Sequence, residues 1–163
     1  MGKINMLYDT PEDITIVLSA LADDTVVASS EIDNTSDLYE DYLVRFQIKT
    51  GTSVDAAGKI YFYAVGAIDD TGRTYPTNSK GQIPLGLPMV ANADGTTYTS
   101  DVYSVRKAFN GVLPAYFKVV VDNQTGAALN ATKPRVLNIV NCLAQTIQEC
   151  QKFNQCQDKE SSE

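Results

Sequence analysis

The feature that most constrains the fold is a two-residue alternation of apolar and polar side chains. It is clearest in Val44-Arg45-Phe46-Gln47-Ile48-Lys49, where the alternation has no break. A strand with one buried and one wet face requires this period, whereas a helix requires 3.6 residues. The segment 44–49 is therefore predicted to be a half-buried β-strand.

Other segments also read as strands. The segment 60–68 is rich in Tyr, Phe, Val and Ile and is apolar on both faces, as inner strands are. We expect it to pair with the strand before it, across the irregular loop 50–58. Further strands are expected at turn-bounded segments, which are 14–18, 26–29, 102–105, 116–122 and 136–145. Two strands should meet at the turn 122–126, which is rich in Asn and Gly.

The remaining segments complete an all-β prediction. Segment 83–89 mixes apolar residues with Pro and Gly, which suits an edge strand or an extended loop. The best helical segment before the C-terminal region is a turn around 104–109. Many short strands between turn-rich loops are typical of an antiparallel sandwich. We predict a jelly-roll-like β-sandwich over 13–147, preceded by an N-terminal arm (1–12) and followed by a polar C-terminal tail (148–163).

Composition narrows the classes of function. The chain has 163 residues, enough for one domain that folds without a disulfide or metal. It has no His, which removes imidazole bases and His-ligated zinc. Its 13 Lys and Arg against 20 Asp and Glu give a net charge of −7, which argues against nucleic acid and acidic lipid as partners. No apolar run approaches the roughly 20 residues that span a bilayer, and the first eleven residues lack a signal-peptide core.

Carboxylates and cysteines offer no catalytic or metal-binding pattern. Acidic pairs at 12–13, 23–24, 40–41 and 69–70 adjoin turn residues, where solvated charge is the default rather than a glycosidase pair. Segments 69–72 and 92–95 resemble fragments of calcium loops but lack the full ligand spacing, so Asx turns are favoured. The spacing of Cys142, Cys150 and Cys156 matches no zinc motif and assigns them no role. We expect no catalytic residue, metal or cofactor.

Tyrosine supplies the candidate interface. The chain has nine Tyr and five Phe, and Tyr61 and Tyr63 fall on one side of a predicted strand. They are a recognition platform, a subunit contact or half-buried core residues. With Tyr98 they could also stack against a sugar, although the absence of Trp weakens that interpretation. The candidate interface residues are Tyr61, Tyr63, Tyr98 and Phe153.

Two motifs carry more specific information than composition. The first is 33–39, followed by the strand to Lys49, and the second is 109–114, followed by a strand and the turn 123–126. In the first, Asp33, Asn34 and Thr35 form an Asx or Ser/Thr turn that sets the angle of the next strand. In the second, Gly111 and Pro114 suggest a rigid corner, and Asn123 and Gly126 a tight turn.

Together with 16–21 and 60–68, these motifs resemble small virion structural proteins of tailed bacteriophages over about 13–140. The resemblance implies a non-enzymatic capsid decoration (cement) protein or a head or tail accessory protein, made in the host cytoplasm and located in the virion. It implies binding through loops and termini to the major capsid protein or other virion proteins, and homo-oligomers, with a trimer suggested by symmetry. The alternative function is a carbohydrate-binding or adhesin-type sandwich on the particle, with a glycan as ligand. The extension after Ile147 departs from the shorter family pattern.

The polar tail leads to the first testable prediction. Residues 148–163 contain too little apolar surface to build a core alone, so we expect them to become ordered only against a partner. Deleting them should leave the melting temperature of the isolated protein nearly unchanged and should weaken assembly, as measured by thermal unfolding and sedimentation. A large fall in melting temperature would show that the tail belongs to the folded domain.

Overall fold

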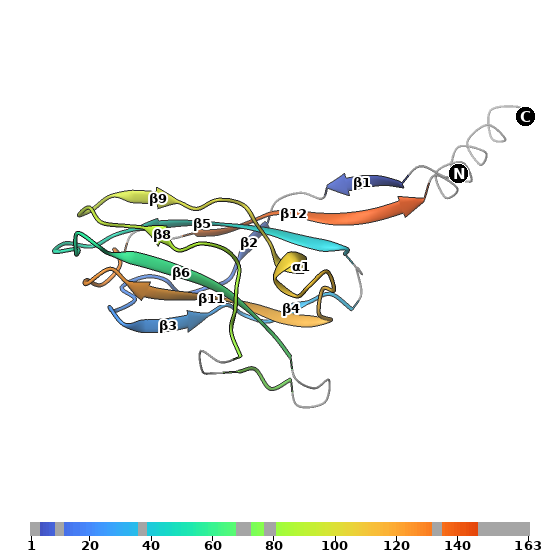
Figure 1. Ribbon diagram of the computed structural model, residues 1–163, viewed down its shortest axis with the longest axis horizontal. Coiled ribbons are helices and arrows are strands. Elements are labelled where there is room, and N and C mark those ends of the chain that lie inside the picture. Colours follow the sequence, from blue (N-terminus) through green and yellow to red (C-terminus); the bar gives the residue numbers. More distant parts are fainter. Residues whose placement is uncertain are drawn as a thin grey trace, which may run out of the picture.

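The chain folds into two antiparallel β-sheets packed face to face (Figure 1). A computed structural model describes residues 4–8, 12–35, 39–67, 73–76, 81–131 and 135–146. Sheet A contains β1 (Ile4–Tyr8), β2 (Glu12–Ile14), β5 (Asp41–Lys49), β9 (Thr97–Thr99), β10 (Tyr103–Ser104) and β12 (Arg135–Thr146). Sheet B contains β3 (Thr25–Ala28), β4 (Ile32–Asp33), β6 (Lys59–Gly66), β7 (Ile83–Pro84), β8 (Met89–Val90) and β11 (Tyr116–Gln124). The predicted antiparallel β-sandwich is confirmed.

The strand order is that of a jelly roll. Each of four long strands pairs with two short strands that follow one another along the same edge. β12 pairs with β1 and β2, β11 with β3 and β4, β6 with β7 and β8, and β5 with β9 and β10. Each pair therefore fills one position, so the sandwich has eight strand positions. Numbered along the chain, sheet A has the order 1-8-3-6 and sheet B the order 2-7-4-5, which is the double Greek key of a jelly roll.

Two predicted strand pairings are wrong. β5 pairs with β9, β10 and β12 in sheet A, whereas β6 pairs with β11 in sheet B. The loop 50–58 therefore crosses between the sheets instead of closing a hairpin. The turn 122–126 likewise leads from β11 in one sheet toward β12 in the other. Local periodicity identified these strands but carries no information about which sheet each strand joins.

One predicted strand, 14–18, is only partly a strand. β2 ends at Ile14, and the next four residues stay extended without a β-ladder. Their burial still alternates, and Leu18 is fully buried. The carbonyl of Thr15 accepts a hydrogen bond from Ser30 N at 2.9 Å. The segment keeps its alternation of apolar and polar side chains because it connects the two sheets along the side of the core.

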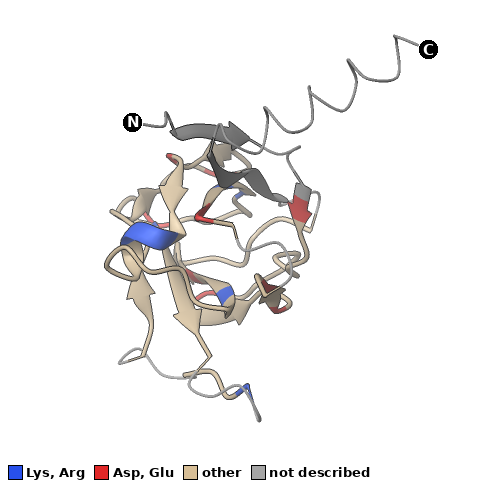
Figure 2. Ribbon diagram, turned by 90° about the vertical axis from the view of Figure 1, so that its right-hand side faces the viewer, with Lys and Arg blue, Asp and Glu red and all other residues tan. Residues whose placement is uncertain are grey.

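The predicted strand 102–105 is also shorter than expected, because a helix replaces its end. β10 covers only Tyr103–Ser104, and α1 (Val105–Ala108) follows within the predicted turn 104–109. Ser104 is the N-cap, and its hydroxyl accepts a hydrogen bond from Lys107 N at 3.0 Å. Asp41 of β5 accepts a hydrogen bond from Arg106 N at 2.9 Å, which ties the helix to sheet A. The broad blue ribbon in Figure 2 marks the basic part of this helix, which contains Arg106 and Lys107.

The segment 83–89 lies at the edge of sheet B, as predicted. It supplies β7 and β8, and both pair with β6. In the part of the chain that the structure describes, neither has a partner on its other side. Pro84 and Pro88 fit here because an edge strand can lack a backbone donor.

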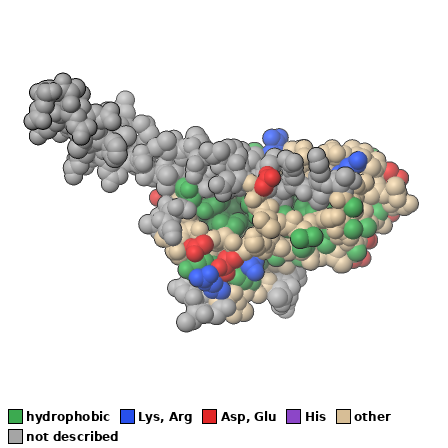
Figure 3. Space-filling model, turned by 180° about the vertical axis from the view of Figure 1, so that it is seen from behind, with side chains coloured by type: hydrophobic (Ala, Val, Ile, Leu, Met, Phe, Trp, Pro, Cys, Tyr) green, Lys and Arg blue, Asp and Glu red, His purple; other side chains and the backbone are tan. Residues whose placement is uncertain are grey.

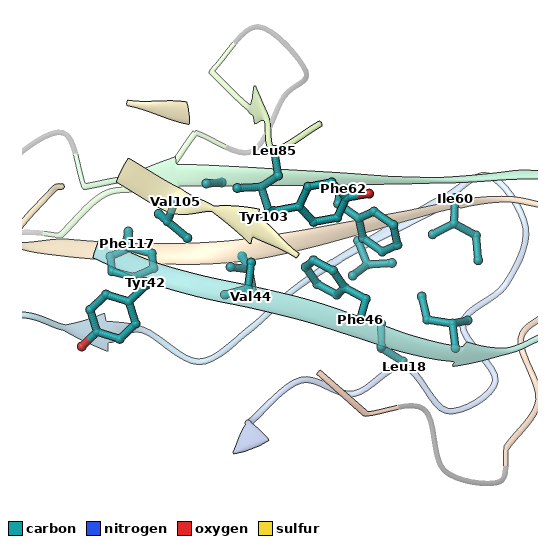
Figure 4. Close-up of a cluster of buried hydrophobic side chains, with 14 of the residues drawn as sticks. Leu18, Tyr42, Val44, Phe46, Ile60, Phe62, Leu85, Tyr103, Val105 and Phe117 are labelled. Carbon is teal, nitrogen blue, oxygen red and sulfur yellow. The ribbon is translucent and has the colours of Figure 1, made fainter. Parts of the chain in front are cut away.

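The core lies between the sheets and is built from their alternating strands (Figure 4). Val44, Phe46 and Ile48 of β5 are fully buried, as the alternation requires. The rings of Phe46 and Phe62 are stacked, with centroids 4.1 Å apart and planes 17° from parallel. Because Phe46 belongs to sheet A and Phe62 to sheet B, this contact joins the two layers.

Replacing Phe46 with Ala tests this contact. The change removes a fully buried ring and leaves a cavity facing Phe62, so the free energy of unfolding should fall by about 3–5 kcal/mol. Urea unfolding at neutral pH measures it. The matched control is Val17→Ala, a residue 70% exposed, which should change the free energy by less than about 0.5 kcal/mol. A loss below about 1 kcal/mol for Phe46→Ala would contradict the arrangement of the core.

Candidate binding surface on the outer face of sheet B

The outer face of sheet B gathers the tyrosines that the sequence singles out. Odd-numbered residues of β11 from Phe117 to Asn123 are buried toward the core, so even-numbered residues face outward. The strand register sets Tyr61 opposite Asp122 and Tyr63 opposite Val120. On the other side of β11, Asp122 lies opposite Val26. We call the set Tyr61, Tyr63, Val120 and Asp122 the outer surface of sheet B.

Tyr61 and Tyr63 form the aromatic part of this surface. Their ring centroids lie 6.4 Å apart, and their planes are 12° from parallel. Both residues are half-buried. Burial raises the pKa of Tyr63, and the charge of Asp122 and the neighbouring Tyr61 raise it further. The pair therefore offers two rings with phenolic hydroxyls beside a carboxyl group.

Asp122 is the most unusual member of the outer surface. Only 9% of the residue is exposed, although it points away from the core. Its Oδ2 accepts a hydrogen bond from Gln124 Nε2 at 3.1 Å. Burial raises its pKa, the Gln124 hydrogen bond opposes this, and the charges of Asp24 and Asp23 add to the rise. Among the described residues, no Lys or Arg nitrogen lies within 4.0 Å of its carboxylate.

A cavity of about 300 Å³ continues the outer surface along the strands. Its apolar lining comes from three adjacent strands and consists of Val26, Ala28, Val65 and Val120. Its remaining lining consists of Tyr75, Pro76, Gln82 and Lys118. An apolar cavity with a few polar groups at its rim is typical of a recognition site, and this volume is at the small end of such sites.

The segment 73–76 is held against sheet B by a network around Glu31. Arg73 forms an ion pair with Glu31, and Tyr75 Oη donates a hydrogen bond to the same carboxylate at 2.6 Å. Arg73 also lies 4.0 Å from the ring centroid of Tyr116, and Lys118 Nζ lies 4.4 Å from that of Tyr75. The Tyr75 hydrogen bond is the largest cause that lowers the pKa of Glu31, followed by Arg73. Burial and Glu31 raise the pKa of Tyr75. Acidic and basic side chains lie side by side on the face in Figure 3.

The other candidate interface residues do not join this surface. Tyr98 lies in β9 of sheet A, opposite the buried Ile48, and packs against the core. Its hydroxyl accepts a hydrogen bond from Ala93 N at 3.0 Å. Phe153 lies outside the described residues, as do Cys150, Cys156 and the tail. Cys142 lies in β12.

The described residues of the first motif make turn hydrogen bonds before β5. Asp33 Oδ1 accepts hydrogen bonds from Thr35 N at 2.8 Å and Thr35 Oγ1 at 2.7 Å, and these bonds lower its pKa. Asn34 is 6% exposed, donates to the carbonyl of Tyr39 at 3.1 Å and accepts from Tyr39 N at 2.8 Å. These residues shape the chain and leave few groups free for a ligand.

The second motif also positions backbone. Asn123 is fully buried, and its side-chain amide donates to three carbonyls, of Leu21 at 3.0 Å, Ala22 at 3.1 Å and Ala127 at 2.9 Å. Gly126 has a φ of +79°, and a side chain there would meet the carboxylate of Asp55.

The corner at Gly111 and Pro114 has the same character. Gly111 has a φ of +91°, which favours glycine, and its N–H donates to the carbonyl of Arg106 at 2.9 Å. The ring of Pro114 packs against Gly66 at the end of β6. A Cβ atom on Gly66 would come within 3.2 Å of that ring.

Sequence reasoning missed Asp122 as a site residue. The polar positions Lys118 and Asp122 alternate with buried residues of β11, which indicates that both face outward. No sequence signal shows that neighbouring strands bury Asp122 on that outer face. In the described part of the chain, no group of three or more His, Cys, Asp or Glu could hold a metal ion, and no helix is long and apolar enough to span a membrane. The surface offers ring faces, hydroxyls, one carboxylate and an apolar cavity, which are groups suited to recognition.

Asp122→Asn tests the electrostatics of this surface. The folded-state pKa of Asp122 is raised, so the folded state binds its proton more tightly than the unfolded chain. Its contribution to stability is therefore fully present below the unfolded pKa and is lost as pH rises through the folded pKa. Asn keeps an oxygen for Gln124 and carries no charge, so the variant should be more stable than the parent at pH 7. The difference should vanish below the ordinary Asp range. A parent that is more stable than the variant at pH 7 in urea unfolding would contradict the burial of an ionised Asp122.

The motif residues thus have clear structural roles, and their resemblance to phage virion proteins remains an expectation. The turn at Asn34 and the turn at Asn123 each place a buried amide where it bonds the backbone. Such roles fit many β-sandwiches and identify no single function. Comparison with known proteins adds no family, because no family model and no curated protein matches the chain.

Proposed function

We propose that the protein is a non-enzymatic structural component of a bacteriophage particle, a capsid decoration or cement protein that binds the major capsid shell. The observation that carries the proposal is a jelly roll with a preformed recognition surface on one sheet. Jelly rolls recur in viral capsid domains and in lectins. A fold alone does not specify a function, so the proposal depends on the chemistry of the outer surface of sheet B.

The chemistry of this surface suits a protein partner. Tyr61 and Tyr63 are half-buried rings with polar tips, the type of residue that is enriched at protein interfaces. The adjoining cavity takes five of its eight lining residues from three hydrogen-bonded strands, which favours a site formed before binding. A preformed site loses little conformational entropy on binding, which favours affinity.

The described residues of two turns are held in place by buried side-chain amides. Asn34 and Asn123 hold their turns through buried side-chain hydrogen bonds to backbone groups. Rigid loops suit a protein that attaches to a repetitive lattice, since each copy must present the same shape. We expect copies of the chain to associate on the particle, with a trimer as the form that capsid symmetry suggests.

A second candidate function is carbohydrate binding. It is favoured by the near-parallel rings of Tyr61 and Tyr63 beside the carboxylate of Asp122. Aromatic faces pack against the apolar face of a sugar, and a carboxylate accepts hydrogen bonds from hydroxyl groups. A glycan array distinguishes the two functions: binding that disappears in Tyr61→Ala and Tyr63→Ala would support this second candidate.

The proposed function makes a direct prediction. Particles purified from a culture that produces this chain should contain it in many copies, as quantified by mass spectrometry against the major capsid protein. Washing the particles at moderate salt should not remove it. The proposal fails if the chain occurs in the lysate of producing cells and never in purified particles.

A further inference from the structure

We propose that the outer surface of sheet B binds an arginine side chain of an extended partner segment, and that the adjacent cavity takes an apolar side chain of the same segment. The inference rests on the proposed function, because it names the chemistry of the partner that the surface would bind. Its three supports are the carboxylate of Asp122, the rings of Tyr61 and Tyr63, and the spacing between Asp122 and the cavity.

The first support is a buried negative charge without a cation. Asp122 is nine-tenths buried, and the described residues give its carboxylate one neutral hydrogen bond, from Gln124. Of the cations on this face, Arg73 pairs with Glu31 and Lys118 lies over the ring of Tyr75. Lys59 lies opposite Gln124 in the strand register and forms no ion pair with Asp122. Burying a carboxylate is costly unless a cation pairs with it. A cation from a partner would offset that cost.

The second support is the aromatic pair next to this charge. Tyr61 lies directly opposite Asp122 in the strand register, and Tyr63 follows two residues along β6. A guanidinium stacks on tyrosine rings and makes two parallel hydrogen bonds to a carboxylate. A lysine ammonium lacks this planar geometry. A sugar would stack on the rings but would leave the buried charge uncompensated, so the surface favours arginine over a glycan.

The third support is spacing. Asp122 and Val120 are two residues apart on β11, and Val120 lines the cavity. Side chains on one face of a strand repeat every two residues, or roughly 6.6–6.8 Å. An extended partner that lies along β11 presents its own side chains at the same interval. An arginine and an aliphatic residue at positions i and i+2 therefore match the carboxylate and the cavity.

The test is an NMR titration of the full, isotope-labelled chain with the peptide acetyl-Leu-Ser-Arg-amide. We expect saturable shifts centred on Asp122, Tyr61, Tyr63 and Val120. The matched peptide carries citrulline in place of arginine, which keeps the shape and removes the charge. It should bind about tenfold more weakly or worse, since a charge-assisted bidentate contact is lost. Equal binding of the two peptides would overturn the inference.

Protein variants supply the second comparison. Asp122→Asn should weaken the arginine peptide by about tenfold or more, and Tyr61→Ala should weaken it several-fold. The control is Asp101→Asn, which should leave the affinity unchanged. Asp101 is an exposed carboxylate on the sheet A side of the molecule. Spectral dispersion and melting temperature confirm that each variant is folded. The inference would be overturned if folded Asp122→Asn bound the peptide with unchanged affinity. It would also be overturned if methyl glucoside saturated the same signals while the peptide caused no shifts.

Particle analysis separates this inference from the proposed function. If the parent chain is found in purified particles and Asp122→Asn is incorporated to the same extent, the proposed function stands and the inference fails. If the parent is incorporated and the variant is depleted about tenfold, both are supported. If the parent is absent from particles, the proposed function fails, and the peptide titration alone decides whether the surface binds arginine.

Discussion

The stacking of Phe46 on Phe62 is the contact through which the two sheets face each other. Tyr103 of β10 lies beside both rings, at 6.2 Å and 5.7 Å between centroids, so the short edge strand is fixed to the same centre. With the inner faces of β5 and β6 set in this way, the opposite face of β6 carries Tyr61 and Tyr63 outward. The outer surface of sheet B thus depends on the core through the two-residue period of one strand.

Sheet B is unusual because apolar residues are buried on its outer side as well. Val65 and Val120 are 1% and 2% exposed, although they face away from the sandwich core. They lie beside the cavity that Tyr75 and Pro76 help to enclose. On the same outer face, burial also raises the pKa of Asp122.

The sequence predicted elements better than their partners. Alternation in 44–49 and apolar character in 60–68 correctly identified β5 and β6. The prediction that these two strands pair with each other was wrong, because the length of a loop does not reveal whether the loop turns back or crosses to a second sheet. The same periodicity predicted that Tyr61 and Tyr63 share one side of a strand, but it did not predict that this side faces outward. The burial of Asp122 could not be predicted, because its covering residues Tyr61 and Val26 come from strands distant in sequence. Tyr98 shows the converse, since an aromatic residue in a similar pattern packs inward.

The place of β12 has a consequence for the order of events during synthesis. This strand lies between β5 on one side and β1 and β2 on the other, so the first and last strands that the structure describes are neighbours in sheet A. In Figure 1, β1 and the end of β12 run together beyond the rest of the sandwich. Before β12 is synthesised, β1 and β2 have no ladder to join, and β5 lacks its longest partner. Sheet B can assemble earlier, because β11 precedes β12. Such long-range pairing makes folding slow and leaves strand edges exposed until β12 has been synthesised.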